Sequence, residues 1–579
     1  MSSFYDAIII GAGHNGLVAA AQLSREGKKV VVLEKRDIVG GCLATEEFHP
    51  GFRASLATPF GQPLRPRIMS ELNLKYHGLQ MVHHDPIVFC PMGPDRHLSL
   101  ARDLETAVAA IAEHSPRDAG RYRQYVGFMN RVREATEAIL DLAPVNPDSS
   151  EPLGLVELAN LGLKLRLLGP EDMHRLMRTV TMCLKDFLDE WFDLDILKAA
   201  LAGPALAGHH YGPYAPGTAA TLIYSYLAGP TGMTKGGMGA ITDTLATVLR
   251  DDSQTIETGV AVESVLIESG TAVGVRLADG RELRARHILS NLDPKRTLQK
   301  LVDPLEFDPS FHRKVRNIQM RGTTTIITLA LSELPLFHCL TGVDQRKFLG
   351  GRIHFGPDLD FLERAADAVK YGRISDAPWV TATIPTLLDP SLAPKDQHIM
   401  QLEVRWTPYH LRKGNWKRQK KFLDAALAVV AEQVPNLEEI ILERKVLTPL
   451  DLEEVYGLTE GHIFHGERNL HQLFIGRPMA GFARYQTPIR NLMLCGSGTH
   501  PGGNTTGACG ANAAREVLLQ LPGNREKAQR VKRAVTSPVG AGLAAAAGLS
   551  LLGAGLAVGK ALKKGRKTDQ RKNEEKEDA

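Results

Sequence analysis

The sequence predicts an α/β protein in which a Rossmann-type dinucleotide-binding domain is interleaved with an α+β domain. Three observations support this fold class. A glycine-rich turn separates a strand-like run from a helical run at the start of the chain, and a second glycine-dense turn does the same near residue 500. At 579 residues and 43% hydrophobic content, the chain also exceeds what one hydrophobic core usually supports, so two domains are expected.

The first predicted unit is a strand, a turn, a helix and a strand over residues 6–34. An apolar run, Ala7 to Ile10, leads into the glycine turn, and a second run, Val30 to Leu33, ends at Glu34. In such a unit the glycines permit the turn, the approach of backbone to a pyrophosphate and close packing of helix on strand. The turn residues predicted to bind the cofactor are Gly11, Gly13, His14, Asn15 and Gly16.

The end of the second strand bears on which nucleotide binds. Glu34 can accept hydrogen bonds from both hydroxyls of an adenosine ribose, and Lys35 follows it directly. An acid at this position favours an unphosphorylated ribose, which indicates FAD or NAD over NADP. Phosphate groups would meet the free N–H groups and the positive dipole at the start of the helix.

The segment after Glu34 favours FAD. Gly40 and Gly41 indicate close backbone approach, and the following residues are polar and loop-like, without a plain alternation of strands and helices. This resembles the second glycine motif of glutathione-reductase-type flavoproteins, in which the loop follows the FAD pyrophosphate.

A third glycine motif lies at residues 491–518. It consists of a short apolar strand, a glycine-dense loop and an alanine-rich helix expected to begin near Thr505. In the flavoproteins that it resembles, this helix points at the flavin, and the loop from Thr499 to Gly503 would lie against the ring. The residues predicted to contact FAD here are Gly496, His500, Pro501, Gly502 and Gly503.

Together these motifs resemble the phytoene-desaturase-like FAD oxidoreductases of the carotenoid desaturase and isomerase group. The resemblance covers about residues 5–520 and is strongest to a subgroup named for a pyridine nucleotide-disulphide oxidoreductase domain. It implies a glutathione-reductase-type Rossmann FAD domain and backbone contact between Val260 and the adenine. Further motifs that carry it are Lys235–Gly239, Thr407–Tyr409, Gly461–His465 and Cys495–Gly502.

The cysteines do not support disulphide oxidoreductase chemistry. That reaction needs a redox-active pair, usually Cys-x-x-Cys, and none of the six cysteines is spaced in this way. Cys495 and Cys509 flank the predicted flavin loop, and buried packing is the favoured interpretation of both. So few cysteines indicate a reducing compartment.

The predicted domains alternate along the chain. The FAD domain is assigned to residues 1–70, 236–300 and 456–521, and the substrate domain to residues 71–235 and 301–455. In the middle part of the predicted FAD domain, residues 236–300, a helix from Ala240 to Leu249 is followed by strands that turn at Ser269-Gly270 and Asp279-Gly280.

The substrate domain is expected to be helical at 101–140 and 152–200, with strands at 323–331, 379–384 and 398–404. Between its halves, residues 201–237 are rich in glycine, proline, alanine and tyrosine, which suits either a cavity wall or a hinge. The candidate substrate-facing residues are His209, His210, Tyr211 and Tyr214.

Three residues are candidates for acid–base catalysis. His500 lies in the predicted flavin loop, and histidine titrates near neutral pH; the alternative is that His500 only caps the loop or hydrogen-bonds the cofactor. Tyr409 and His465 are placed by motif matches. The histidines show no metal-ligand spacing, and neither a hydrolase signature nor a P-loop lysine is present.

Three functions remain open at this point. The first is an FAD-dependent dehydrogenase, desaturase or isomerase that acts on an apolar isoprenoid or lipid by hydride transfer to flavin. The second is a flavin oxidase for an amine or another small molecule. The third is a flavoprotein with a mainly interacting or regulatory role. A second nucleotide fingerprint for NAD(P)H is not recognisable.

The last segment, 522–579, is predicted to be a basic linker, an apolar stretch at 539–559 and a charged tail. The stretch is just long enough to cross a bilayer as a helix, and its small-xxx-small pairs suit helix packing. It is expected to contact a membrane, with a soluble or oligomer-forming helix and a low-complexity extension as alternatives, so a homo-oligomer stays open.

A net charge of +4 makes nucleic-acid binding unexpected. We expect a protein on the cytoplasmic side that is not secreted, because the first strand begins within five residues of the N-terminus.

Overall fold

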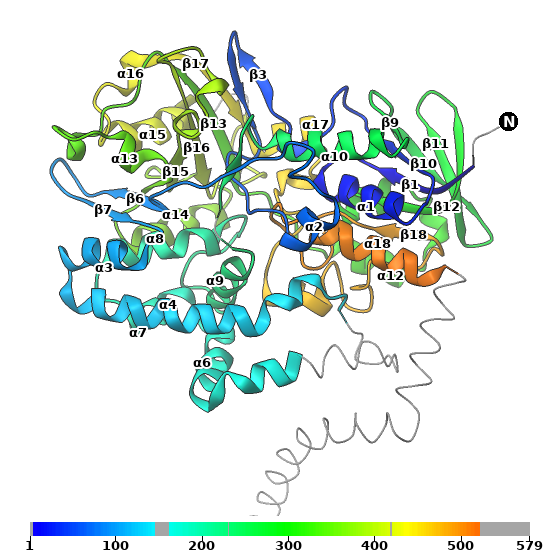
Figure 1. Ribbon diagram of the computed structural model, residues 1–579, viewed down its shortest axis with the longest axis horizontal. Helices are drawn as coiled ribbons and strands as arrows, with labels where there is room; N and C mark the ends of the chain where they lie inside the picture. Colours follow the sequence, from blue (N-terminus) through cyan, green and yellow to red (C-terminus); the bar gives the residue numbers. More distant parts are fainter. Residues whose placement is uncertain (1–3, 145–160, 230, 417–419, 522–579) are drawn as a thin grey trace, which may run out of the picture.

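The computed structural model describes residues 4–144, 161–229, 231–416 and 420–521 (Figure 1). Within these residues, two seven-stranded sheets organise the protein. The first sheet lies at the right of Figure 1 and the second at the upper left, with a group of helices below the second. The predicted domain boundaries themselves stay a prediction.

The first sheet is built from the start, the middle and the end of the described chain. β1 pairs in parallel with β2 and β12, and β18 pairs in parallel with β12, whereas β10, β11 and β12 form an antiparallel meander. The predicted turns at Ser269-Gly270 and Asp279-Gly280 join the meander strands. In spatial order the strands are β10 (Val262–Glu268), β11 (Thr271–Leu277), β12 (Glu282–Ser290), β1 (Phe4–Ile10), β2 (Val30–Leu33) and β9 (Thr255–Glu257), with β18 (Leu492–Leu494) beside β12.

Three helices pack on this sheet through one apolar core. They are α1 (His14–Arg25), α10 (Gly239–Asp251) and α18 (Ala508–Gln520). Leu17, Leu245 and Val517, one from each helix, belong to the same buried cluster. The predicted helix at 240–249 is confirmed as part of α10.

The prediction for the start of α18 was three residues too early. The helix begins at Ala508, not near Thr505, because Gly507 has a left-handed backbone with φ +71°. Thr505 therefore stays in the loop, where its hydroxyl donates to the carbonyl oxygen of Gln62.

The second sheet is antiparallel except for the parallel pair β14 and β6. The predicted strands at 323–331, 379–384 and 398–404 are confirmed as β13, β15 and β16. Every residue of β13 is buried, so both faces of the sheet are covered there. The order is β17 (Ile441–Leu447), β13 (Thr324–Leu331), β16 (His398–Arg405), β15 (Val380–Thr383), β14 (Arg352–Phe355), β6 (Val88–Pro91) and β7 (His97–Leu100).

The helices associated with this sheet share an aromatic core. Tyr125 and Phe128 of α4 pack against Trp191 of α7, with ring centroids 5.6 and 6.0 Å from that of Trp191. Helical structure at 101–140 is confirmed, whereas residues 152–160 of the second predicted helical stretch lie outside the described chain. These helices are α3 (Leu104–Ala112), α4 (Pro116–Thr136), α6 (Gly169–Thr181), α7 (Leu184–Trp191), α8 (Asp195–Leu206), α9 (Thr218–Leu227) and α14 (Leu359–Lys370). The helix α15 (Lys420–Ala431) packs in a separate apolar cluster with residues of the second sheet.

Short elements complete the described structure. The helices are α2 (Pro66–Glu71), α11 (Pro294–Lys300), α12 (Pro309–Arg316), α13 (Arg346–Leu349), α16 (Leu437–Ile440) and α17 (Pro449–Tyr456). The strands form two small antiparallel pairs: β3 (Glu46–His49) with β4 (Phe52–Ala54), and β5 (Met81–Val82) with β8 (Met233–Thr234), which is distant in sequence.

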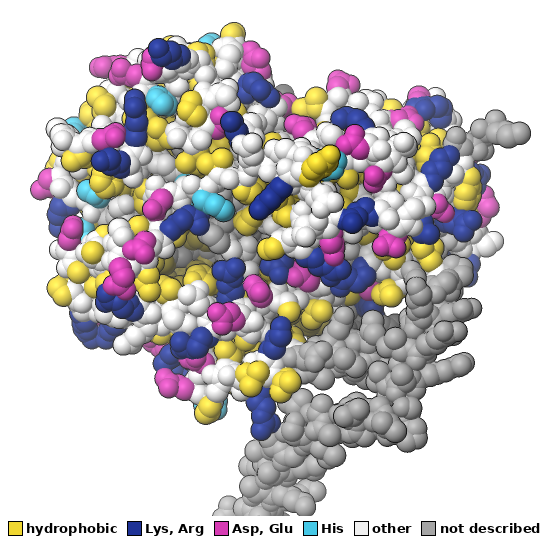
Figure 2. Space-filling model, viewed as in Figure 1, with side chains coloured by type: hydrophobic (Ala, Val, Ile, Leu, Met, Phe, Trp, Pro, Cys, Tyr) yellow, Lys and Arg dark blue, Asp and Glu magenta, His cyan; other side chains and the backbone are white. Residues whose placement is uncertain are grey.

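The surface mixes charges of both signs, since Lys and Arg side chains alternate with Asp and Glu over the face shown in Figure 2. Among the described residues, no helix combines the length and the apolar character needed to span a membrane. The predicted tail at 522–579, with its apolar stretch at 539–559, lies outside them.

Candidate cofactor and substrate site

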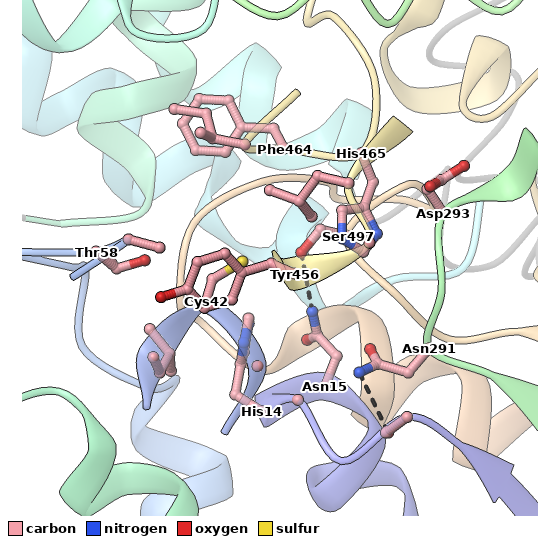
Figure 3. Close-up of a pocket in the computed structure, with 18 of the residues that line it drawn as sticks. His14, Asn15, Cys42, Thr58, Asn291, Asp293, Tyr456, Phe464, His465 and Ser497 are labelled. Atoms are coloured by element: carbon pink, nitrogen blue, oxygen red, sulfur yellow. Dashed lines mark hydrogen bonds between the residues drawn. The ribbon is translucent and has the colours of Figure 1, made fainter. Parts of the chain in front are cut away.

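A cavity of about 330 Å³ is lined by residues of both sheets (Figure 3). One part of its wall comes from the turn between β1 and α1, and another comes from β14 and β16 of the second sheet. Residues 453–458, 463–465 and 468 also line it, together with Ser497, Asn504 and Thr505. The glycine motifs and the second sheet therefore contribute to one site.

The turn after β1 forms the floor of this cavity. Gly11 has φ +95°, and its N–H donates to the carbonyl oxygen of Leu33 at 2.7 Å. A side chain at Gly16 would collide with the Gly11 carbonyl oxygen, which explains the glycine there. The start of α1 consequently faces the cavity, with Gly13, His14 and Asn15 in its wall.

Glu34 directly follows β2 and is 8% exposed. Its carboxylate accepts hydrogen bonds from the backbone N–H groups of Ala12, at 2.8 Å, and Arg36, at 2.9 Å. These two bonds fix the carboxylate beside the glycine turn and the cavity, which is the position needed to meet a ribose. The Val260 N–H donates to the Glu34 carbonyl oxygen at 2.8 Å, so Val260 lines the wall beside it.

The second glycine motif is held directly against the first. Gly40 has φ +116°, and its N–H donates to the carbonyl oxygen of Ala12 at 2.9 Å. A Cβ at Gly40 would lie 2.9 Å from the hydroxyl oxygen of Thr242. Gly40 and Gly41 thus bring backbone, without side chains, to the cavity.

The loop after β18 completes this part of the cavity wall. We call the glycine turns, the start of α1, Glu34 and this loop together the cradle. Ser497, just after β18, accepts a hydrogen bond from the Asn15 side chain at 3.1 Å, and both residues line the cavity (Figure 3). Asn291, just after β12, donates to the Gly11 carbonyl oxygen at 3.3 Å. Asn504 and Thr505 line the cavity too.

The cradle fits a dinucleotide. Several buried polar atoms of its wall have no hydrogen-bond partner within the described chain, and buried polar groups ordinarily have one. They include His14 Nε2, Asn15 Oδ1, Gln62 Oε1 and His465 Nδ1. Glycine backbone, a helix N-terminus, a fixed carboxylate and these polar atoms are the groups that hold a nucleotide cofactor.

The predicted cofactor residues divide into two groups. Those that line the cavity are Gly11, Gly13, His14, Asn15, Glu34, Lys35, Gly40, Gly41 and Val260. Those that do not belong to the lining are Gly16, Gly496, His500, Pro501, Gly502 and Gly503. The late loop reaches the cavity through residues 497, 504 and 505, and its contact with the flavin stays a prediction.

His500 faces the interior of the protein, not the cavity. It is 1% exposed, and its Nε2 lies 2.7 Å from the carbonyl oxygen of Ile139. Burial lowers the pKa of His500 to about 4, so the ring is neutral at pH 7. This placement corresponds to the loop-capping interpretation of His500.

The other two catalytic candidates differ in position. The Tyr409 hydroxyl donates to the carboxylate of Glu453, and Tyr409 itself does not line the cavity although Glu453 does. His465 lines the cavity, near Asp293 in Figure 3, and burial lowers the pKa of its imidazole. His465 is thus the one of the three predicted candidates that reaches the site.

The segment 201–237 contributes to the cavity wall through other residues than those predicted. Its lining residues are Pro204, Ala207, Ser225 and Thr231. His209 is 1% exposed and outside the lining. The Tyr211 hydroxyl contacts Arg321 at 3.1 Å, and the Tyr214 hydroxyl donates to Asp360. His210 does not line the cavity either.

The sequence interpretation missed a charged group in the wall. Arg352, Glu403, Arg405 and Arg468 line the cavity, and the first three come from β14 and β16. Glu403 and Arg405 end a strand that is otherwise largely apolar, and charged residues in a buried strand were the available signal.

All six cysteines lie in the described chain and are free. Cys495 and Cys509 are buried, at 0% and 1% exposure, among core residues. Cys42 lines the cavity, but burial raises the pKa of its thiol to about 12, so it is not a thiolate at neutral pH.

The fold and the cradle together define an FAD-dependent oxidoreductase. A family model for flavin containing amine oxidoreductases matches residues 16–333, and the chain belongs to this family. It is also 36% identical to pyridine nucleotide-disulfide oxidoreductase domain-containing protein 2 of Rattus norvegicus, over 89% of this chain and 94% of that protein.

More distant similarities span nearly the whole chain. A limonene dehydrogenase component of Castellaniella defragrans is 26% identical over 89% of this chain and 95% of that protein. The zeta-carotene-forming phytoene desaturase of Myxococcus xanthus is 26% identical over 86% and 90%. A structure of putrescine oxidase bound to putrescine has a TM-score of 0.54 at 16% identity, covering 90% of this chain and 100% of that chain, which shows a shared fold.

Proposed function

We propose that this FAD-dependent oxidoreductase is a dehydrogenase, desaturase or isomerase that acts on an apolar, isoprenoid- or lipid-like molecule. The observation that carries the proposal is the cavity that joins the glycine cradle to the second sheet. Two relatives, the limonene dehydrogenase component and the phytoene desaturase, are named for isoprenoid hydrocarbons, which supports an apolar substrate.

Bound FAD supplies the acceptor for a hydride that leaves a carbon atom of the substrate. The role of the protein itself is to position that carbon and to exclude water. Phe60, Ile463 and Phe464 line the cavity with apolar surface, and Pro204 and Ala207 add small apolar groups. Such walls bury a hydrocarbon body and keep water from the reacting carbon.

His465 is the candidate proton acceptor in this proposal. Oxidation of a carbon–carbon single bond to a double bond releases a proton as well as a hydride. The Nδ1 atom of His465 is buried and has no hydrogen-bond partner in the described structure. Because burial lowers its pKa, the ring is neutral at pH 7 and able to take that proton.

The two alternatives receive less support. An amine oxidase would bind a cationic amine, but the cavity wall holds Arg352, Arg405 and Arg468 against the single carboxylate Glu403 in the same group. The fold shared with putrescine oxidase does not identify a substrate. If the protein had only an interacting or regulatory role, no substrate would reduce its FAD. The following experiment distinguishes that role from an enzymatic one.

The experiment is an anaerobic titration of the flavin absorbance of the holoenzyme with a lipid extract, putrescine, NADH and NADPH. Bleaching by the lipid extract alone is expected, and an H465N variant should be bleached at least tenfold more slowly. H338N, a change in an exposed histidine of the second domain, is the matched control and should behave as wild type. Bleaching by putrescine or NAD(P)H, with none by lipid, would contradict the proposal.

A further inference from the structure

Three arginines and one glutamate form a charged group in the cavity wall, with Arg405 and Arg468 buried and Arg352 and Glu403 half-buried. Arg352 begins β14, Glu403 and Arg405 lie at the end of β16, and Arg468 lies in the loop before Asn469. Arg405 is 5% exposed and Arg468 is 1% exposed, so both guanidinium groups are inside the protein.

The hydrogen bonds of this group are incomplete. Arg405 Nη2 donates to Glu403 at 2.7 Å, and Arg468 Nη2 donates to the Ala207 carbonyl oxygen at 3.0 Å. The Nε atoms of Arg352, Arg405 and Arg468, and Nη1 of Arg405, are buried without a partner among the described residues. Unpaired buried donors are costly, and charged ones more so.

Arg477 shows what a structural arginine looks like in the same protein. It is 1% exposed, and its N–H groups donate to the backbone carbonyl oxygens of Phe464, Gly466, Glu467 and Ser497. It does not line the cavity. Burial alone therefore does not leave the donors of an arginine unpaired in this protein, because those of Arg477 are paired.

The charges of the group do not balance. Three guanidinium groups face one carboxylate, and Glu403 already accepts from Arg405 and from the Thr381 hydroxyl at 3.3 Å. Burial, with the charges of Arg477 and Arg405, lowers the pKa of Arg468 to about 10 despite the opposing effect of Tyr224. With three guanidinium groups and one carboxylate, this part of the wall attracts an anion.

We propose that Arg352, Arg405 and Arg468 form a subsite for an oxyanion, so that the substrate is an apolar molecule with a carboxylate or phosphate group. The inference rests on the proposed function, because it assigns the apolar body of that substrate to the remaining walls. A guanidinium group offers paired N–H donors that match the geometry of either oxyanion. An amine at the same place would meet excess positive charge.

The test is equilibrium binding to the FAD-loaded protein, followed by the shift of the flavin spectrum without turnover. The probes are dodecanoate, dodecyl phosphate, dodecanol and dodecylamine, all below their micellar concentrations. We expect dodecanoate or dodecyl phosphate to bind at least tenfold more tightly than dodecanol, and dodecylamine to bind most weakly. The tighter of the two anions identifies the head group. Equal binding of dodecanol and both anions would overturn the proposal.

Arginine variants test whether these side chains cause the preference for an anion. R405M and R468M should weaken binding of the preferred anion at least tenfold, while R405K, which keeps the charge, should recover part of it. R373M, a change in an exposed arginine of the second domain, is the control. Unchanged anion binding in R405M and R468M would overturn the proposal. So would loss of flavin from both folded variants, because the group would then hold the cofactor.

This result is separable from the proposed function. Arginine-dependent binding of an anion without bleaching by any lipid would keep the subsite and reject the dehydrogenase. Bleaching by lipid with no dependence on the head group would keep the dehydrogenase and reject the subsite.

Discussion

The Nδ2 atom of Asn15 donates a hydrogen bond of 3.1 Å to the hydroxyl oxygen of Ser497, across 482 residues of sequence (Figure 3). Asn15 lies in the first turn of α1, and Ser497 follows β18. Both side chains line the cavity. The bond therefore ties the first glycine motif to the last, and the cradle is complete only when β18 has joined the first sheet.

Removal of this bond should weaken cofactor binding. We expect N15A to bind FAD about fivefold more weakly, since a buried hydrogen bond contributes about 1 kcal/mol. The measurement is calorimetric titration of the apoprotein with FAD. N436A removes the solvent-accessible hydrogen bonds of Asn436 with Glu333 and with the Leu336 N–H, and it should bind FAD as wild type. Equal FAD affinity in N15A and wild type would show that the bond does not organise the cradle.

A side chain at Gly16 should disrupt the same site for a steric reason. Its Cβ would collide with the Gly11 carbonyl oxygen and lie 3.0 Å from Cβ of Asn291. We expect G16A to lose about 1–3 kcal/mol of unfolding free energy and most of its flavin.

The matched control is G120A in the second turn of α4. A Cβ at Gly120 would meet open space, so alanine should stabilise the helix by about 0.5–1 kcal/mol. Urea unfolding with simultaneous flavin absorbance measures both effects. A stable, flavin-loaded G16A would contradict the close approach seen at this turn.

Glu34 should matter through its charge as well as its shape. E34Q keeps one acceptor for the Ala12 N–H but loses the charge that strengthens this bond and the predicted bond to a ribose hydroxyl. We expect about tenfold weaker FAD binding, and E263Q, on the exposed side of β10, should have no effect. FAD affinity in E34Q equal to that in wild type would remove Glu34 from the cofactor site.

His500 should affect stability at acid pH more than it affects turnover. Its pKa is about 4 in the folded protein against an ordinary value of 6.5, so the unfolded chain takes up the proton first as pH falls. Stability is therefore full above about pH 6.5 and falls towards pH 4. Between pH 7 and pH 5 this one residue lowers the unfolding free energy by about 2 kcal/mol.

H500Q separates this effect from catalysis. Its amide can still donate to the Ile139 carbonyl oxygen but cannot titrate. We expect the loss of unfolding free energy from pH 7 to pH 5 to be smaller in H500Q, and lipid-dependent bleaching to persist. A large fall in the bleaching rate without a change in stability would restore His500 as a catalytic candidate.

Much of the cofactor cradle could be predicted from the sequence because its motifs are local. Gly11, Gly13 and Glu34 lie within one strand–turn–helix–strand unit, in which backbone geometry alone dictates the residue types. The meander turns at 269–270 and 279–280 were predictable for the same reason. In contrast, the positions of His500 and Arg405 depend on which distant segment packs against each loop or strand.

The sequence by itself determined the Rossmann unit, the glycine motifs and the FAD cofactor, since these depend on short-range backbone requirements. Only the tertiary structure decided that His500 turns to the Ile139 carbonyl oxygen and that His465 reaches the cavity. It also gathered Arg352, Arg405 and Arg468 around one wall from two strands and a loop. A local sequence pattern does not predict these side-chain contacts, because they result from the packing of segments up to hundreds of residues apart.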